Sequence, residues 1–427
     1  MGGPVYIVDG ARTPFLKARG KPGPFTPVDL AVQCGRPLIL RQPFPSDAFD
    51  QVILGCVNVI AEEMNPARIA ALRLGLGDEM PAYTVQINCG SGMLSIDAAY
   101  RTIERGAAEL ILAGGTEALS YTPLVLRHEA VEWLGEFRQA ASAWQKLKKL
   151  GDVRASYLKP EIGLERGLTD PVVNLNMGQT AEILAHRFDI SREESDRYAL
   201  ESHLRLARAQ EEGWLADEVM LAVDRDGAVY ERDDGVRPDS SMEKLAELKP
   251  AFERPYGKVT PGNSSQITDG ASWVILASEA AVERHGLKPR ARIVDSEWRA
   301  LSPAVMGLGP VLAATALMKR HGLGLDAVDL WELNEAFAAQ VLACLAAWED
   351  DGFCREILGL DGPLGRIPRD KLNVDGGAIS LGHPVGTSGN RIALRLVNAL
   401  ARLNGTRGIA TECIGGGQGG AMLLERV

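Results

Sequence analysis

Apolar residues recur at the spacing of an α-helix in two stretches, one in each half of the chain. The first has the apolar positions Met93, Ile96, Tyr100 and Ile103, and the second has Ile392, Leu396, Leu400 and Leu403. Each predicted helix ends near a glycine, and an apolar run typical of a buried strand follows, at 110–113 and 408–410. The two halves therefore predict the same elements in the same order.

Two further stretches indicate a diverged internal repeat. Residues 5–9 return at 291–295, and residues 50–58 return at 326–334. The order strand, helix, strand, helix, strand in each half is typical of layered α/β proteins. Three similarities in one order predict a duplicated α/β fold.

Between the halves lies a long segment, 120–265, which we interpret as an insertion that covers the core. It contains a predicted amphipathic helix at 191–212. Ser191 is a suitable N-cap, Glu194 completes a capping box, and Gly213 ends the helix.

The insertion also carries an amphipathic stretch at 131–150. Apolar and basic residues share helical spacing there: Leu134, Phe137, Ala141, Trp144 and Leu147, with Arg138, Lys146, Lys148 and Lys149 nearby. Such a pattern is found on membrane surfaces, against partner subunits and in ordinary helices that pack on their own core or on a second copy of the same subunit. The pattern leaves these three interpretations open.

Composition excludes several classes of protein. The 427 residues carry a net charge of −10 without a basic tract, which argues against nucleic-acid binding. Apolar runs such as 52–61 are shorter than the ~20 residues that span a bilayer. The first residues lead directly into a strand, so we expect no signal peptide and a cytoplasmic, reducing location. Six cysteines without a C-x-x-C pair, and dispersed histidines, predict no metal site.

Cys89 is the first candidate for chemistry. It lies between a predicted strand and a glycine-flanked helix start, where unpaired N–H groups favour a thiolate. Gly90 and Gly92 would let a large substrate approach the sulfur. The alternative is a structural cysteine in a turn.

His383 occupies the equivalent place in the second half. A histidine at a helix N-terminus tends to stay neutral, because the helix dipole disfavours the imidazolium ion. A neutral imidazole can take a proton from a thiol or donate to an oxyanion. The alternative is a surface histidine in a Gly/Pro turn.

Two further candidates follow predicted strands. Cys413 precedes a glycine-rich loop whose letters match G-x-G-x-x-G, but only residues 421–427 follow, so a dinucleotide-binding helix does not fit. The N–H groups of this loop are suited to stabilise an oxyanion instead. Asn334 ends the repeated strand 326–334 and is suited to cap a helix or to hold a water or carbonyl oxygen.

Five motifs together resemble those of the thiolase family. They are Ile87-Asn88-Cys89-Gly90-Ser91-Gly92, Gly114-Gly115-Thr116-Glu117, Asn334-Glu335-Ala336-Phe337, Gly382-His383-Pro384 and Cys413-Ile414-Gly415. The resemblance covers essentially the whole chain. It implies two similar βαβαβαββ halves in a layered α/β/α/β/α core with an inserted loop domain. We accordingly expect one half at 1–119 with 266–288, the loop domain at 120–265 and the other half at 289–427.

The resemblance also implies a role for each candidate residue. Cys89 would attack the 3-keto carbon of a 3-ketoacyl-CoA and hold the shortened acyl group, while His383 takes its proton. Cys413 would protonate the departing acetyl-CoA enolate and then deprotonate incoming CoA. One oxyanion site would use the backbone N–H groups of Cys89 and Gly415, and the other His383 with a water held by Asn334.

CoA and acyl-CoA are substrates in this reaction, and the resemblance implies neither a metal nor a redox cofactor. Met177 and Ser265 belong to segments that resemble the family's CoA-facing loops. Phe337, in the motif Asn334-Glu335-Ala336-Phe337, is expected to contact substrate as well.

Within the family, stretches 234–238, 249–252 and 353–359 resemble the trifunctional-protein β-subunits of fatty-acid β-oxidation. This resemblance implies CoA-dependent cleavage of 3-ketoacyl-CoA. Asn176 replaces a histidine of several short-chain biosynthetic thiolases, although a biosynthetic acetyl-CoA C-acetyltransferase remains the alternative. Asn334 departs from the histidine common in the trifunctional branch.

That branch works beside a second polypeptide with hydratase and dehydrogenase activities. We therefore expect a partner subunit or a peripheral membrane contact at 131–150. We also expect a homodimer or a dimer of dimers, joined through a sheet edge at strand 110–113. Two rivals keep the fold: a ketoacyl synthase and a catalytically inactive thiolase-like binding protein. The pair of Cys89 and Cys413 favours a thiolase over both.

Overall fold

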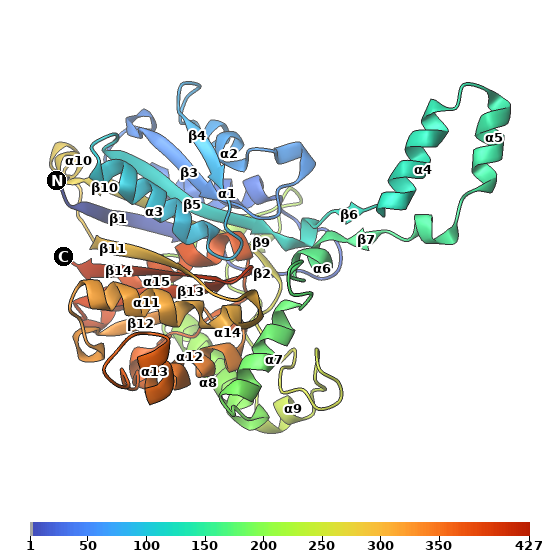
Figure 1. The fold of residues 1–427 in the computed structure, drawn as a ribbon. Coiled ribbons are helices and arrows are strands. Elements are labelled where there is room, and N and C mark those ends of the chain that lie inside the picture. The colour runs from blue at the N-terminus through green and yellow to red at the C-terminus, as the bar shows by residue number, and fades with distance from the viewer. Residues whose placement is uncertain (1–2) are drawn as a thin grey trace.

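The computed structural model describes residues 3–427 and contains a long sheet that runs through both halves of the chain (Figure 1). Across the described residues its strands follow the order β4 (Ala82–Val85), β3 (Gln51–Gly55), β5 (Leu110–Ala118), β10 (Thr268–Ser278), β1 (Val5–Arg12), β11 (Ala291–Ala300), β14 (Gln418–Arg426), β13 (Arg407–Ile414) and β12 (Leu330–Leu333). The short β2 (Leu16–Lys17) pairs with β10. The strands from β4 to β1 form one half, and those from β11 to β12 form the other.

The two halves meet where β1 and β11 pair antiparallel. Val5 lies opposite Ile293, and Ile7 lies opposite Ala291, so equivalent residues exchange partners about the pair of Tyr6 and Arg292. Each strand also has a bulge at the equivalent position, after Ile7 in β1 and after Ile293 in β11. A pseudo-twofold axis therefore relates the halves, as the repeat of 5–9 at 291–295 predicts.

The register of the second repeat is wrong in the sequence-based alignment. The ladder pairs Gln51 with Ile111 in one half and Leu330 with Gly408 in the other, which makes Gln51 and Leu330 equivalent. The alignment of 50–58 with 326–334 is therefore displaced by three residues. Both strands are short and almost uniformly buried, so they show no alternation of buried and exposed positions that would define a register.

Helices divide the core into five layers. α3 (Ser91–Glu104) and α15 (Val385–Leu403) pack against each other in a cluster with strand residues of both halves, such as Ile53 and Met422. α1 (Pro27–Leu40) and α2 (Pro66–Leu74) cover the outer face of one half. α11 (Gly309–Arg320) and α12 (Ala338–Glu349) cover the outer face of the other. This is the predicted α/β/α/β/α arrangement, and both central helices match the predicted apolar stretches.

Strand β5 lies inside the sheet, so the expectation of a free edge at 110–113 is wrong. β5 pairs with β3 on one side and β10 on the other. The uniform burial of its residues reflects this central place. The free edge of this half is β4, where Tyr83 is 38% exposed.

The insertion leaves the sheet after β5 and returns at β10. The helix predicted at 191–212 is confirmed as α8 (Arg192–Glu211), with the capping box between Ser191 and Glu194. α7 (Met177–Arg187) precedes it. The smaller elements of the chain are α6 (Gly163–Gly167), β8 (Ala222–Val223), β9 (Val229–Tyr230), α9 (Met242–Ala246), α10 (Glu279–His285), α13 (Asp351–Glu356) and α14 (Ala378–Leu381).

The most distinctive part of the insertion is an arm that projects from the body (Figure 1). A stalk of β6 (Leu124–Val125) and β7 (Glu161–Ile162) carries α4 (His128–Gln139) and α5 (Ala143–Gly151). The amphipathic stretch 131–150 is thus divided into two helices, because the chain turns between them. No helix among the described residues is long and apolar enough to cross a membrane.

Candidate active site

A cavity of about 460 Å³ lies at the start of α3, where both halves and the insertion meet. Cys89 comes from the first half, Gly415 and Val385 from the second, and Met177 from the insertion. Cys89 ends the turn that joins β4 to α3, and Gly415 follows β13 directly. The duplicated fold therefore brings the two predicted strand-end sites together.

Two backbone N–H groups near the Cys89 thiol, its own and that of Gly415, act to lower its pKa. They are the pair expected to bind an oxyanion, and a group attached to the sulfur would reach the same donors. Asn88 supports this pair, because its side-chain Nδ2 donates to the Gly415 carbonyl at 2.8 Å. Asn88 itself has φ of 50°, a left-handed conformation that asparagine tolerates better than most residues.

The expectation that the helix start holds Cys89 as a thiolate is not supported. Burial raises the pKa of Cys89 from 9.0 to about 11, and the carboxyl groups of Glu412 and Glu117 add to the shift. α3 begins only at Ser91, so the sulfur precedes the helix by two residues. Since desolvation dominates, the thiol needs a base to become a nucleophile.

His383 is buried, and it is not among the residues that line the cavity around Cys89. Its Nδ1 lies 2.6 Å from Ser388 Oγ, whereas its Nε2 has no hydrogen-bond partner among the described residues. Burial, with the positive charge of Arg391, lowers the pKa of His383 to about 4. The ring is neutral as expected, but burial rather than a helix dipole is the main cause.

Cys413 and Asn334 are the two most enclosed candidates. Cys413 is 1% exposed, and burial together with a charge on Cys89 raises its pKa well above the usual value. The Asn334 amide is fully buried, and neither its oxygen nor its nitrogen has a partner among the described residues. A buried amide of this kind is suited to hold a water or a substrate oxygen.

The predicted CoA-contacting residues divide into two groups. Met177 lines the cavity, and its sulfur lies 3.4 Å from the point where a Cβ on Gly415 would stand. Ser265 and Phe337 lie together elsewhere: the Ser265 N–H donates to the Ala336 carbonyl at 2.9 Å, and Phe337 stacks edge-on against Phe252. Neither is among the residues that line the cavity.

Glu117 ends the motif Gly114-Gly115-Thr116-Glu117, and its place in the sequence predicts no role for it. Its buried carboxyl accepts the backbone N–H groups of Val57, Asn58 and Gly386 at 3.2, 2.9 and 2.9 Å. Burial raises the pKa of Glu117 to about 7. Glu117 thereby joins three chain segments that surround the cavity.

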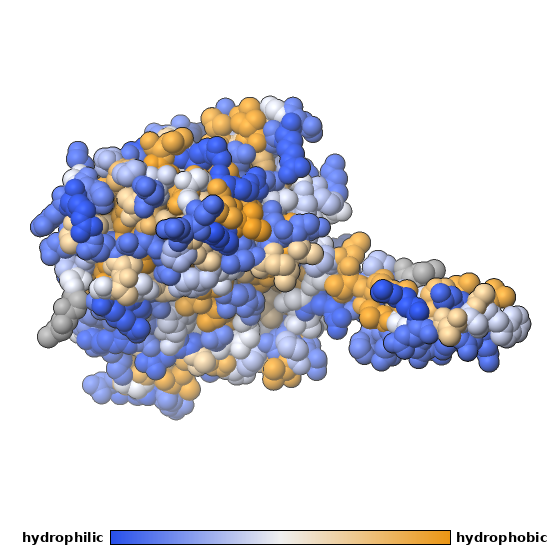
Figure 2. Space-filling view, turned by 90° about the horizontal axis from the view of Figure 1, so that it is seen from above, coloured by the Kyte–Doolittle hydropathy of each residue, from blue (hydrophilic) through white to orange (hydrophobic). Residues whose placement is uncertain are grey.

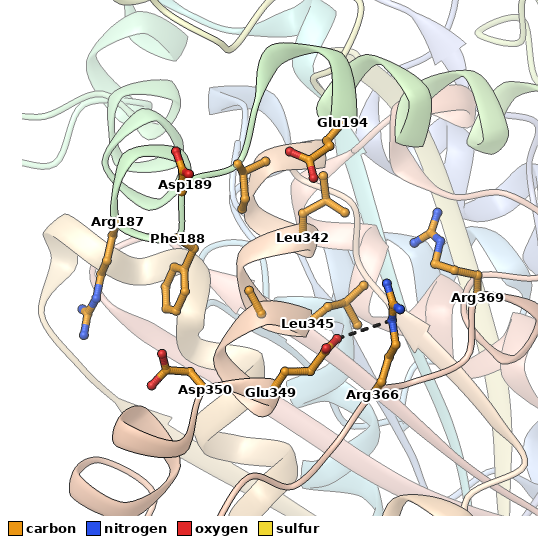
Figure 3. A pocket seen from close by; sticks show the side chains of 12 residues that line it. Arg187, Phe188, Asp189, Glu194, Leu342, Leu345, Glu349, Asp350, Arg366 and Arg369 are labelled. Atoms are coloured by element: carbon orange, nitrogen blue, oxygen red, sulfur yellow. Dashed lines mark ion pairs between the residues drawn. The ribbon is translucent and has the colours of Figure 1, made fainter.

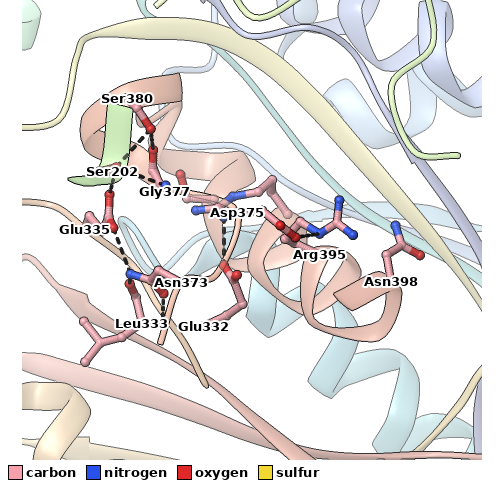
Figure 4. A network of polar contacts seen from close by, with 12 residues as sticks. Ser202, Glu332, Leu333, Glu335, Asn373, Asp375, Gly377, Ser380, Arg395 and Asn398 are labelled. Carbon is pink, nitrogen blue, oxygen red and sulfur yellow. Dashed lines mark hydrogen bonds and ion pairs between the residues drawn. The ribbon is translucent and has the colours of Figure 1, made fainter. Parts of the chain in front are cut away.

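Glu335 has a similar role beside Asn334 (Figure 4). Its carboxylate accepts from Tyr198 Oη at 2.9 Å, Ser202 Oγ at 2.7 Å and Asn373 Nδ2 at 3.0 Å. This network fixes the turn that carries Asn334. Tyr198 and Ser202 lie more than 100 residues from Glu335 in the chain, and Asn373 lies 38 residues from it, beyond any local pattern.

A second cavity of about 540 Å³ lies between the end of α7 and α12 (Figure 3). It is lined by charged groups of both signs, among them Arg187, Glu349 and Arg366, and Arg366 pairs with Glu349 at 3.5 Å. Its described lining includes no cysteine or histidine, so it does not offer the groups for acyl transfer.

Comparisons with known proteins agree with this geometry. The model for the thiolase N-terminal domain matches residues 5–280, and that for the C-terminal domain matches 287–426. The bovine mitochondrial trifunctional enzyme subunit beta is 36% identical, covering 99% of this chain and 88% of that protein. The β-ketoadipyl-CoA thiolase of Pseudomonas aeruginosa is 39% identical, covering 99% of each. The crystal structure of human mitochondrial 3-ketoacyl-CoA thiolase superposes with a TM-score of 0.85 at 37% identity, covering 100% of this chain and 99% of that one.

A duplicated α/β fold with a cysteine at a cavity between its halves defines an acyl-transferring enzyme. The chain belongs to the thiolase family and is an acyltransferase. The predicted thiolase fold, with two similar halves and an inserted loop domain, is confirmed.

Proposed function

We propose that the protein is a degradative 3-ketoacyl-CoA thiolase, which cleaves 3-ketoacyl-CoA with CoA to acetyl-CoA and a shortened acyl-CoA. The observation that carries this proposal is that Cys89 and Gly415, which come from opposite halves, line one cavity, where the N–H groups of both lower the pKa of the Cys89 thiol. The similarity to human 3-ketoacyl-CoA thiolase and to a trifunctional β-subunit supports the degradative direction.

In the first half-reaction, His383 takes the Cys89 proton and the sulfur attacks the 3-keto carbon. The developing oxyanion accepts from the N–H groups of Cys89 and Gly415. The bond between the α and β carbons then breaks, and its electron pair leaves as the enolate of acetyl-CoA. Protonated His383 and a water held by Asn334 stabilise that enolate, and Cys413 supplies the proton that makes acetyl-CoA.

In the second half-reaction, the Cys413 thiolate takes the proton of incoming CoA. The CoA sulfur attacks the acyl-Cys89 thioester, and the same pair of N–H groups stabilises the intermediate. Cys89 leaves and recovers a proton from His383. These steps use the chain's own groups and the substrates, so the proposal includes CoA and acyl-CoA but no metal or redox cofactor.

We propose a homodimer through the free edge of β4, in place of the incorrect edge at β5. An exposed strand edge offers unpaired backbone groups to a second sheet. Tyr83 is 38% exposed on this strand, and Gln86 and Asn88 follow it toward the cavity. Sedimentation of the active enzyme tests this proposal, and an active monomer would contradict it.

The arm is the proposed contact for a partner subunit or a lipid surface. Trp133 stacks on Phe137 inside the arm, and its Nε1 donates to the Lys149 carbonyl at 2.9 Å. The outer side exposes five large apolar residues: Val131, Leu134, Trp144, Leu147 and Leu150. Figure 2 shows apolar surface along the arm, well separated from the body. The interpretation that Trp144 packs on the chain's own core is thus wrong, since its side chain is 74% exposed.

The cytoplasmic location of the protein stays a prediction.

The release of acetyl-CoA from 3-ketoacyl-CoA substrates of increasing length tests the proposed function. We expect CoA-dependent cleavage, with a kcat/KM for 3-ketoacyl-CoA that exceeds the kcat/KM for acetyl-CoA in the reverse condensation. An enzyme that condenses acetyl-CoA efficiently but cleaves only acetoacetyl-CoA would instead be the biosynthetic acetyltransferase.

A further inference from the structure

The insertion supplies one wall of the cavity that also contains Cys89. Leu164 of α6 and Leu168, which follows it, are half-buried lining residues of this wall. Pro123 completes it, because its carbonyl accepts the N–H of Gly163 at 3.0 Å. Cys89 lines the same cavity, so the wall is available to an acyl group carried on its sulfur.

The described lining of this cavity contains an acidic side chain and no basic one. The described residues that line the cavity include no lysine, arginine or histidine. Asp170 is the charged residue among them, and it is only 4% exposed. Its Oδ1 accepts the N–H groups of Val172 and Val173 at 2.8 and 3.1 Å, which holds the carboxylate in place.

The arginine next to this wall in the chain makes its ion pair outside the cavity. Arg166 lies beside the lining residue Gly167, but its guanidinium pairs with Glu161 at 2.9 Å and is 68% exposed. Glu161 belongs to the stalk of the arm and also pairs with Arg127, at 3.4 Å. The ion pairs of the stalk therefore hold Arg166 away from the cavity.

We infer that the acyl subsite takes an uncharged alkyl chain and rejects a chain that ends in a carboxylate. A terminal carboxylate on this wall would lose water without gaining a cationic partner, and Asp170 would repel it. The inference rests on the proposed thiolase function and specifies its substrate class. It separates this chain from the activity named for its Pseudomonas aeruginosa relative.

Two substrates of equal length test the inference. Thiolysis of 3-oxohexanoyl-CoA leaves a butyryl group on Cys89, and thiolysis of 3-oxoadipyl-CoA leaves a succinyl group with a carboxylate in place of the terminal methyl. We expect kcat/KM to favour 3-oxohexanoyl-CoA by roughly 100-fold or more, because the carboxylate is buried unpaired. Equal values, or a preference for 3-oxoadipyl-CoA, would overturn the inference.

Variants of the wall give an independent measurement. Leu164→Arg supplies the missing cation, and Leu164→Gln is its neutral control. We expect the Arg variant to gain roughly 10-fold in relative kcat/KM for 3-oxoadipyl-CoA over the Gln control. If Leu164→Arg does not fold, Leu168→Arg with Leu168→Gln provides the same comparison. An unchanged ratio in folded variants would show that the chain lies elsewhere.

Arg166→Gln tests whether Arg166 binds the terminal carboxylate of 3-oxoadipyl-CoA. We expect the ratio of the two substrates to stay unchanged, and a selective loss of 3-oxoadipyl-CoA cleavage would overturn the inference. Both substrates share the CoA moiety and the reacting 3-keto group, so a difference between them reports on the chain end alone. Cleavage of neither substrate would overturn the thiolase proposal itself, and the inference with it.

Discussion

The side chain of Asn88 donates a hydrogen bond to the carbonyl of Gly415, and so connects the turn before the nucleophile to the loop after Cys413. The two residues belong to opposite halves of the duplicated fold. The proposed oxyanion pair of Cys89 and Gly415 therefore combines residues from both halves rather than from one.

Replacing Asn88 tests the importance of this connection. Asn88→Ala removes the hydrogen bond and forces an alanine into a left-handed conformation, so we expect kcat/KM to fall roughly 10- to 100-fold. Asn88→Gly is the matched control, because glycine accepts the backbone conformation but also lacks the amide. A steady-state comparison separates the two effects. Full activity in both variants would show that the connection is dispensable.

The reactivity of Cys89 should reveal its raised pKa. Only the thiolate reacts with iodoacetamide, and the pKa of Cys89 is about 11. A pKa above the working range means that the thiolate fraction increases as pH rises, so alkylation of Cys89 should accelerate continuously from pH 7 to pH 9. Peptide mapping with Cys89→Ala as control identifies the labelled site. A plateau near pH 7 would indicate a thiolate stabilised by the helix start instead.

His383 and Cys413 should fail at different steps. His383→Ala removes the base and an oxyanion donor, so we expect no acylation of Cys89. Cys413→Ala should still accept an acyl group from a simple acyl-CoA but should not exchange the α-proton of acetyl-CoA with solvent. Deuterium exchange followed by mass spectrometry measures this difference. Normal exchange in Cys413→Ala would assign the acid/base role to another group.

The arm should be separable from catalysis. Trp144 and Lys148 lie on α5, far from the cavity, so replacing them with serine and glutamine should leave turnover of short 3-ketoacyl-CoAs unchanged. Binding to anionic vesicles, or co-purification with a hydratase/dehydrogenase subunit, should decrease, and lipid binding should weaken with salt. Leu40→Ser, on the body, is a control with a comparable exposed apolar side chain. Insolubility of the arm variant alone would contradict a docking role.

The sequence predicts the fold well where the hydrophobic pattern is periodic. The helices over Met93 and Ile392 have one apolar face each, and capping at Ser191 defines a helix start. Short buried strands such as β3 and β12 have no periodic apolar pattern, which explains the displaced register and the misplaced sheet edge.

The candidate site was predictable where a residue's chemistry is local, and not where burial decides it. The places of Cys89 and His383 follow from strand ends and glycine-rich turns. Their pKa values depend on desolvation by segments distant in the chain, which reverses the expectation for Cys89. Glu117 accepts three backbone N–H groups from two distant segments, 57–58 and 386, and no spacing along the chain indicates that contact.

The acyl-enzyme provides the most direct test of the proposed mechanism. The enzyme is mixed with 3-oxohexanoyl-CoA without free CoA, quenched in acid, digested and mapped by mass spectrometry. We expect a butyryl group on the peptide that contains Cys89 and release of one acetyl-CoA for each acylated chain. An acyl group on Cys56, Cys344 or Cys354 instead, or release of acetyl-CoA without any acylated cysteine, would contradict the mechanism.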